Sequence, residues 1–267
     1  MTERHEESVI YLRSSQQEHY STAIILGTGL GGLVKDIDIK SAIDYSEIPN
    51  FPVSTVESHS GKLIFGTLSG KNIIAMQGRF HYYEGYSMND VTFPIHILKE
   101  LGVNNLVVSN ACGSINPAFK KTELMIMTSH INFLFDTPLI VDKKLSLTGG
   151  HKLYSKRLIR LAEETALENE IAIQKGTYVP VQGPNLETVA EYRMIRKIGG
   201  DTVGMSTIPE VLIANELGIE VLGLSIITDE GFPDTLKVAE LKHILEAASV
   251  AEPNLTLLIR KLVEKLN

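Results

Sequence analysis

Residues 22–32, TAIILGTGLGG, combine a short apolar run rich in β-branched residues with a cluster of glycines that ends it. This pattern is typical of a buried β-strand, here Thr22–Leu26, that leads into a loop. Similar runs along the chain predict further strands at Asn105–Ser109, Glu220–Thr228, Tyr178–Val181 and Asp201–Met205. Lys62–Leu68 and Asn72–Gln77 flank a Ser69-Gly70 turn, and this arrangement predicts a β-hairpin.

Helical patterns lie between these strands. They predict helices at Val91–Leu101, Leu153–Asn169, Val189–Ile198, Pro209–Leu217 and Lys237–Leu266. Pro209 suits the first turn of its helix with Thr207 as the N-cap, and Pro253 is expected to kink or split the last helix. The alternation of strands and helices predicts one α/β domain over residues 1–267, with a mixed central β-sheet flanked by helices. Residues 1–20 are expected to form a peripheral helix or arm.

The composition excludes several classes of protein. The chain has 25 Lys and Arg against 32 Asp and Glu, a net charge of −7, and its basic residues form no block longer than a pair. A nucleic-acid groove is therefore not expected. The lone Cys112 excludes an intramolecular disulfide, and the eight histidines show no metal-binding spacing, so no metal is expected. With a polar start and no apolar run long enough for a bilayer, the expectation is a cytoplasmic protein without a membrane partner.

The glycine loop at 27–32 has three readings. Gly27, Gly29 and Gly32 satisfy G-x-G-x-x-G, and Glu47 lies about 20 residues further on, as in a dinucleotide-binding oxidoreductase. That fold needs a helix directly after the glycines, whereas the sequence offers barely two turns. In the second interpretation the glycines have no ligand and only allow the positive φ angles of a tight turn. The preferred reading is an anion-binding loop, in which backbone N–H groups and the Thr28 hydroxyl are donors.

Arg79 is the single arginine between Arg13 and Arg157. It lies in QGRFHYYEG at 77–85, directly after a predicted strand and between glycines and aromatic residues. Because its guanidinium is a planar fork of donors, Arg79 is a candidate for bidentate phosphate contact. A solvated strand end is the alternative. His59, in the polar loop ESHSG, is a second candidate, although an isolated histidine is more often structural.

Taken together, these loops resemble the trimeric purine nucleoside phosphorylase family. The motifs that carry the resemblance are GTGLGG at 27–32, ESHSGKL at 57–63, QGRFHYYEGY at 77–86, SNACGSINP at 109–117, GTYVPVQGPNLETVAE at 176–191 and DTVGMSTIPEV at 201–211. They occur in the family's order and run from about residue 20 to residue 229. The resemblance implies a phosphorylase/hydrolase-like three-layer α/β/α fold. A dinucleotide oxidoreductase and a nucleoside-binding protein without turnover remain the competing classes.

The resemblance also implies a reaction and a site. Phosphate would displace a purine from C1′ of a nucleoside in purine salvage, giving free base and ribose 1-phosphate. In the family the phosphate is held by residues that match Thr28, His59, Arg79, His81, Ala111 and Ser206. The nucleoside is held by residues that match Tyr83, Ala111, Met205, Glu187 and Asp229. His81, Glu187 and Asp229 are the candidate catalytic residues. No metal or organic cofactor is implied, because inorganic phosphate is the co-substrate.

Two positions depart from the family pattern. Asp229 stands where phosphorylases of 6-oxopurines usually carry Asn. An ionised Asp can only accept a hydrogen bond, which suits a 6-amino group, whereas a protonated Asp can donate to N7. Leu241, or alternatively Glu240, stands where the family places a histidine for the 5′-hydroxyl, although a shifted alignment would bring His243 there. Both departures favour a methylthioadenosine or adenosine phosphorylase, whereas Glu187 favours 6-oxopurines.

The resemblance implies a homotrimer as well. In the family an aromatic residue of the neighbouring subunit completes the sugar site, and Phe133 and Phe135 are the candidates here. Cys112 is expected to be a small buried residue rather than a reactive thiol, because no neighbouring base or positive charge in the sequence favours a thiolate.

Overall fold

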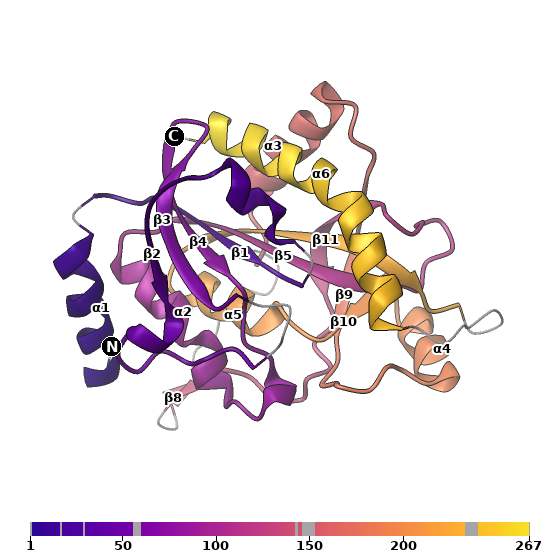
Figure 1. Ribbon diagram of the computed structural model, residues 1–267. Coiled ribbons are helices and arrows are strands. Elements are labelled where there is room, and N and C mark those ends of the chain that lie inside the picture. Colours follow the sequence, from indigo (N-terminus) through magenta and orange to yellow (C-terminus); the bar gives the residue numbers. More distant parts are fainter. Residues whose placement is uncertain are drawn as a thin grey trace.

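The computed structural model of the chain describes residues 2–16, 18–28, 30–55, 60–141, 144–145, 153–232 and 240–266, with the backbone alone at 140–141 and 144–145. A twisted central sheet runs through the molecule between two layers of helices (Figure 1). This architecture confirms the predicted α/β fold with a mixed sheet.

The described strands form one large sheet and one small hairpin. They are β1 Thr22–Leu26, β2 Asp38–Asp44, β3 Lys62–Leu68, β4 Lys71–Gln77, β5 Asn105–Ser114, β6 Leu124–His130, β7 Ile140–Val141, β8 Lys144–Leu145, β9 Ile173–Pro180, β10 Thr202–Gly204 and β11 Glu220–Glu230. Nine of them follow the order β10-β9-β6-β11-β5-β1-β4-β3-β2, and β10 pairs with β5 as well. The run β4-β1-β5-β11 is parallel throughout. In such a run the carboxyl ends of the strands meet at one edge, which is the usual place for a ligand site.

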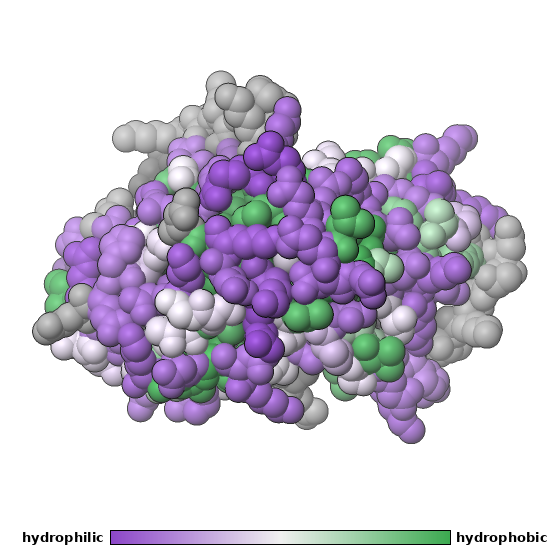
Figure 2. Space-filling view, turned by 90° about the horizontal axis from the view of Figure 1, so that it is seen from above, coloured by the Kyte–Doolittle hydropathy of each residue, from purple (hydrophilic) through white to green (hydrophobic). Residues whose placement is uncertain are grey.

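The helices divide between the two faces of the sheet. They are α1 Glu3–Ser15, α2 Met88–Glu100, α3 Lys156–Glu168, α4 Val189–Lys197, α5 Ile208–Glu216 and α6 Leu241–Lys265, with short 3₁₀ helices η1 Gly31–Asp36, η2 Tyr45–Glu47 and η3 Tyr82–Glu84. Side chains of α1, α2 and α5 share one apolar core with the sheet. Those of η1, α3 and α6 share a second core. Each helix buries one stripe, and hydrophilic residues predominate on the face seen from above (Figure 2).

Most predicted elements are present, with shifted ends. The hairpin turn has positive φ at both Ser69 and Gly70, which is the backbone that a two-residue hairpin favours. The last helix starts at Leu241 and continues through Pro253 as one element, so it is not split there. Strands β2, β6, β7 and β8 were not predicted from the sequence. The prediction also ended β5 too early, because the strand runs on to Ser114 through small and polar residues.

The structure excludes the dinucleotide-binding reading of the glycine loop. After β1 the chain forms only η1 and then β2, which pairs antiparallel with β3, so no parallel β-α-β unit follows the glycines. The positive-φ reading is also wrong for the described glycines 27, 31 and 32. Gly27 has another reason to be glycine, because a Cβ there would lie 2.7 Å from the Ser109 carbonyl oxygen of β5. The loop is packed closely against the strand that carries the centre of the site.

Candidate active site

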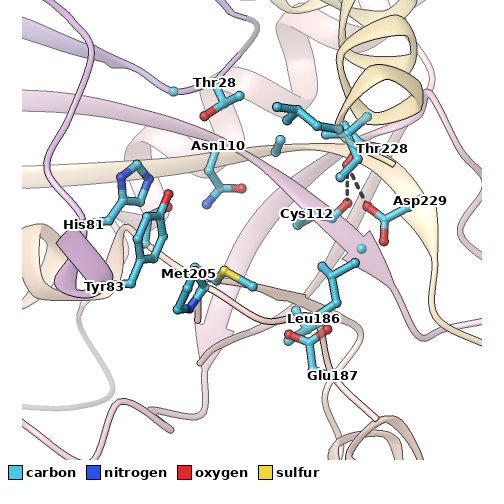
Figure 3. Close-up of a pocket in the computed structure, with 18 of the residues that line it drawn as sticks. Thr28, His81, Tyr83, Asn110, Cys112, Leu186, Glu187, Met205, Thr228 and Asp229 are labelled. Atoms are coloured by element: carbon cyan, nitrogen blue, oxygen red, sulfur yellow. Dashed lines mark hydrogen bonds between the residues drawn. The ribbon is translucent and has the colours of Figure 1, made fainter. Parts of the chain in front are cut away.

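A cleft of about 250 Å³ opens at the carboxyl ends of the parallel strands. It brings together nine of the ten predicted site residues, namely Thr28, Arg79, His81, Tyr83, Ala111, Glu187, Met205, Ser206 and Asp229. Figure 3 shows Thr28, His81 and Tyr83 on one side of the cleft and Glu187 and Asp229 on the other. His59, the tenth, lies outside the described residues. Segments separated by up to 200 residues along the chain therefore form one site.

Arg79 is the centre of the polar end of the cleft. Its side chain is only 2% exposed, and Nε lies 3.3 Å from Glu210 Oε1 of α5. Nη1 donates to the Ser206 hydroxyl at 2.9 Å and to the Thr207 hydroxyl at 2.8 Å. A buried guanidinium fixed by a carboxylate and two hydroxyls is held in one orientation. Arg79 is therefore not a solvated strand end, which was the alternative reading of its loop.

His81 is oriented by its own loop. Its backbone N–H donates to Glu84 Oε1 at 2.8 Å, and the ring Nδ1 lies 3.0 Å from the same oxygen. The ring also stacks on Tyr83 at 4.7 Å between centroids. Burial alone would raise the pKa of Glu84, but hydrogen bonds from His81 and Thr55 outweigh it and hold that pKa at about 2. An ionised Glu84 only accepts, so Nδ1 carries a proton and the ring is fixed.

The carboxyl group of Asp229 lies at the opposite end of the cleft. Thr228 donates to Asp229 Oδ1 at 2.8 Å (Figure 3), and Oδ2 lies beside Gly113, where a Cβ would approach it to 2.7 Å. Burial raises the pKa of Asp229, and the hydrogen bond from Thr228 opposes the shift. Gly113 thus leaves the space that this carboxyl group occupies.

Glu187 lies near Asp229 in the same end of the cleft. It is 8% exposed, and its Oε1 is buried without a hydrogen-bond partner among the described residues. Burial raises the pKa of Glu187, and the charge of Asp229 adds to the shift, whereas the hydroxyl of Tyr192 lowers it. A buried acceptor without a protein partner costs free energy unless another group donates to it. The arrangement is suited to a ligand that brings its own donors.

Leu241, the residue expected to replace a histidine of the family at the 5′ end of the sugar, lies at the edge of the cleft. Leu241 is the first residue of α6, and it lines the cleft together with Ile244 although it is 63% exposed. His243 is not among the described residues that line the cleft. The interpretation in which an alignment shift brings His243 to the 5′ position is therefore not supported.

Phe133 and Phe135 lie next to the cleft rather than in it. Their rings stack at 5.5 Å, Phe135 is 83% exposed, and both line a neighbouring cavity of about 260 Å³ that shares Glu187 with the site. Cys112 lies on the cleft floor, and burial together with the charge of Asp229 raises its pKa to about 12. As expected, it is not a reactive thiol.

Two buried polar residues of the site were not predicted from the sequence, and a third was predicted in another role. Asn110 lines the cleft and donates to the Thr207 hydroxyl, and Glu210 pairs with Arg79. A signal existed for Glu210, since a carboxylate in the otherwise apolar helix IPEVLIANE needs a buried partner. Thr207 was expected as an N-cap, but its hydroxyl makes no cap hydrogen bond. Among the described residues there is no cluster of three metal ligands and no helix that meets the length and hydropathy of a membrane span.

Comparison with known proteins places the chain in a family. A sequence model described as phosphorylase superfamily matches residues 21–264. Over 233 residues the chain is 47% identical to purine nucleoside phosphorylase 1 of Bacillus subtilis, covering 86% of each sequence. It is 40% identical over 264 residues to purine nucleoside phosphorylase of Bos taurus, covering 95% of this chain and 91% of the relative.

Solved structures agree with the sequence relatives. Schistosoma mansoni purine nucleoside phosphorylase in complex with adenosine matches with a TM-score of 0.93 at 35% identity, covering 99% of this chain and 98% of that one. A schistosoma purine nucleoside phosphorylase in complex with hypoxanthine matches with a TM-score of 0.90 at 36% identity, covering 99% and 98%. The fold and the site thus define a phosphorylase, and the chain belongs to the phosphorylase superfamily. Within it the chain belongs with the purine nucleoside phosphorylases, which are pentosyltransferases.

Proposed function

We propose that the chain cleaves the N-glycosidic bond of purine ribonucleosides and deoxyribonucleosides with inorganic phosphate. A phosphate oxygen bonds to C1′ while the bond from C1′ to N9 breaks, and the electron pair of that bond leaves with the purine. The products are free base and ribose or deoxyribose 1-phosphate. The observation that carries this proposal is one cleft with a buried arginine and two hydroxyls at one end, and the buried Glu187 and half-buried Asp229 carboxyls at the other.

The arginine end supports phosphate binding. Arg79 is buried and fixed, Ser206 and Thr28 add hydroxyls, and the backbone of Ala111 lies in the same wall. Such preorganised donors stabilise an anion without reorganising when it arrives. We assign the phosphate to these residues together with His81 and with His59, which lies outside the described part of the chain.

The carboxyl end supports binding of the base. Glu187 offers a buried acceptor suited to N1–H and the 2-amino group of a 6-oxopurine. Asp229, whose pKa burial raises, can donate a proton to N7 as negative charge develops on the departing purine. Met205 lies between the two ends and Tyr83 stacks on His81 beside it, and we assign both to the ribose (Figure 3).

A second candidate is a phosphorylase of adenosine and 5′-methylthioadenosine. Asp229 in the base end and Leu241 with Ile244 at the edge of the cleft favour it, because a carboxylate accepts from a 6-amino group and an apolar wall suits a methylthio group. The related structure with bound adenosine is compatible with a 6-aminopurine in such a site. Purine nucleosides in general remain the first choice because of Glu187.

The experiment is a comparison of base release with and without phosphate. Inosine, guanosine, adenosine and 5′-methylthioadenosine are each incubated with the protein, and the free base is measured by chromatography. The proposal expects phosphate-dependent release of hypoxanthine and guanine. If inosine and guanosine are inert and methylthioadenosine is cleaved, the second candidate replaces the first. Base release that does not depend on phosphate would overturn both.

The phosphate assignment has its own test. Arg79→Ala leaves the buried Glu210 carboxylate without a counter-charge, so Arg79→Lys, which keeps the charge but loses the fork, is the sharper variant. We expect KM for phosphate to rise at least tenfold in Arg79→Lys, since a charge-assisted hydrogen bond contributes about 1.5–3 kcal/mol. Lys197→Ala on the exposed side of α4 is the control. Equal small effects of both variants would contradict the assignment.

The remaining expectations are proposals about context. We infer a single phosphorylase domain over residues 1–267, an enzyme of purine salvage in the cytoplasm, and phosphate as co-substrate without a cofactor. We also infer a homotrimer, in which the exposed Phe135 or its stacked neighbour Phe133 reaches the sugar site of the next subunit. Light scattering gives the subunit number, and Phe135→Ala should raise KM for the nucleoside if that residue completes the site.

A further inference from the structure

Thr207 adopts a backbone conformation that a β-branched residue rarely accepts. Its φ is 78° and its ψ is −43°, and the Ile208 N–H donates to the Ser206 carbonyl oxygen at 2.9 Å across it. This is a classic-type γ-turn, which is rare and strained. Such a conformation costs on the order of 1–3 kcal/mol and persists where the surroundings enforce it, often in functional sites. Helix capping does not explain it, since the Thr207 side chain caps nothing.

The hydroxyl of Thr207 has both of its acceptor positions filled. Arg79 Nη1 donates to it at 2.8 Å, and Asn110 Nδ2 donates to it at 2.8 Å. A hydroxyl group has two lone pairs and one proton, so Thr207 must send its proton elsewhere. The Ser206 hydroxyl oxygen lies 3.1 Å away and is an available acceptor. Of the two possible directions of this bond, the contacts select donation from Thr207 to Ser206.

The same count applies to Ser206. Its hydroxyl accepts from Arg79 Nη1 at 2.9 Å and from Thr207, so both of its lone pairs are used as well. The neighbouring Tyr178 hydroxyl accepts the Ser206 backbone N–H at 3.3 Å. The Ser206 proton therefore points away from Arg79 and Thr207, toward the Tyr178 hydroxyl or toward the cleft that Ser206 lines. A hydroxyl whose two lone pairs are used has only its proton to offer, and a donor is what an incoming phosphate requires.

We propose that Thr207 is a positioning residue that fixes the Ser206 hydroxyl as a donor to phosphate. This inference rests on the proposed phosphorolytic function and deepens it. Arg79 and Asn110 set the direction of the Thr207 hydroxyl, and Thr207 sets the direction of the Ser206 hydroxyl. Both lone pairs of the Ser206 hydroxyl are used before phosphate binds, so Ser206 meets the anion as a donor. The strained γ-turn is explained by this arrangement, because it places two adjacent hydroxyls within reach of one guanidinium nitrogen.

The test is a double-mutant cycle with Thr207→Val, Ser206→Ala and the double variant. Thr207→Val keeps the branched shape but has no proton to give, and we expect KM for phosphate to rise roughly tenfold to a hundredfold with KM for the nucleoside within about threefold. Because Thr207 acts through Ser206, the double variant should be no worse than the worse single variant. Thr207→Ser, which keeps the hydroxyl, should restore KM for phosphate to within about threefold of the native value.

Direct binding of inorganic phosphate by calorimetry separates this inference from the proposed function. If native protein binds phosphate but releases no base, the proposed function fails, and the affinities of Thr207→Val and Thr207→Ser still decide the role of Thr207. If Thr207→Val does not fold, Thr207→Gly, which accepts positive φ, replaces it in the cycle. Multiplicative effects in the cycle, equal losses in Thr207→Ser and Thr207→Val, or no phosphate binding by native protein would each overturn the inference.

Discussion

Replacing Asp229 with Asn should shift base preference toward 6-oxopurines. In the native protein Thr228 donates to Oδ1 at 2.8 Å, so that atom must be an acceptor. In Asp229→Asn the amide oxygen takes this place, and the amide nitrogen takes the place of Oδ2 beside Gly113. The variant therefore presents a fixed donor to the base where an ionised Asp229 presents only lone pairs.

The size of the shift follows from one buried contact. When a buried acceptor faces another acceptor, or a donor faces another donor, binding is weaker by about 1–3 kcal/mol than with a good hydrogen bond. That range corresponds to roughly 5- to 150-fold in a rate ratio, since 1.4 kcal/mol is about tenfold. We expect the ratio of kcat/KM for inosine to kcat/KM for adenosine to rise by about tenfold or more in Asp229→Asn.

A pH profile gives a second signature of the same carboxyl group. Burial raises the pKa of Asp229, so its protonated form, which can donate, extends to higher pH than for an exposed carboxyl. Native kcat/KM for inosine should fall as pH rises through this raised pKa, and Asp229→Asn should lack that fall. Glu216→Gln, which removes an exposed carboxylate at the end of α5, is the control. A ratio that stays within twofold of native, with an unchanged pH profile, would refute the reasoning.

Three further predictions concern the surroundings of the site. Gly113→Ala should lower kcat/KM for every nucleoside, since the new Cβ would lie 2.7 Å from Asp229 Oδ2 and displace that carboxyl group. KM for phosphate should stay within about threefold of the native value. Kinetics that match the native protein would contradict this prediction. Iodoacetamide at pH 8 should leave Cys112 unmodified in the folded protein but alkylate it in urea, because burial raises its pKa to about 12; mass spectrometry reads the outcome. The pKa of Glu84 is lowered from 4.5 to about 2, so its ionised form stabilises the folded protein fully above pH 4.5, and this stabilisation is lost as pH falls toward 2. The urea midpoints of native protein and Glu84→Gln should therefore converge between pH 4.5 and pH 2.

The sequence predicted the strands whose composition is apolar and missed those that are not. Thr22–Leu26 is correct to the residue, because five buried side chains in a row leave no other interpretation. Asp38–Asp44 was missed because only one of its residues is buried, so its pairing with β3 rather than its side chains makes it a strand. The end of β5 was missed because its last residues are small and polar. Such residues leave room for the cleft that they line, but they lack the apolar pattern that predicts a strand.

The candidate site was predictable where an irregular motif carries it. The cleft contains Arg79 and Ser206 as expected, and both lie in long motifs whose order along the chain matches the family. Their contacts could not be predicted. Glu210 lies in the same motif as Ser206 and Asn110 in the motif at 109–117, but only the fold shows that they contact Arg79 and Thr207. The direction of a hydroxyl proton depends on such partners, so it has no signature in the sequence.

The buried ion pair at the polar end also bears on how an acidic protein binds an anionic substrate. Arg79 is compensated by Glu210 before phosphate arrives, so the guanidinium alone does not offset the charge of a phosphate dianion. Neutral donors, among them the hydroxyls of Thr28 and Ser206, provide the rest of the stabilisation in the ground state. When the bond from C1′ to N9 breaks, the sugar gains positive charge and the base gains negative charge. The phosphate then faces a cation that was absent before, and a protonated Asp229 faces the new negative charge on the purine. Both interactions strengthen in the transition state, which is the condition for binding energy to raise kcat. We therefore expect Glu210→Gln to tighten phosphate binding and to lower kcat. Without the Glu210 charge, Arg79 would stabilise the dianion more strongly in the ground state, and less stabilisation would be gained on reaching the transition state.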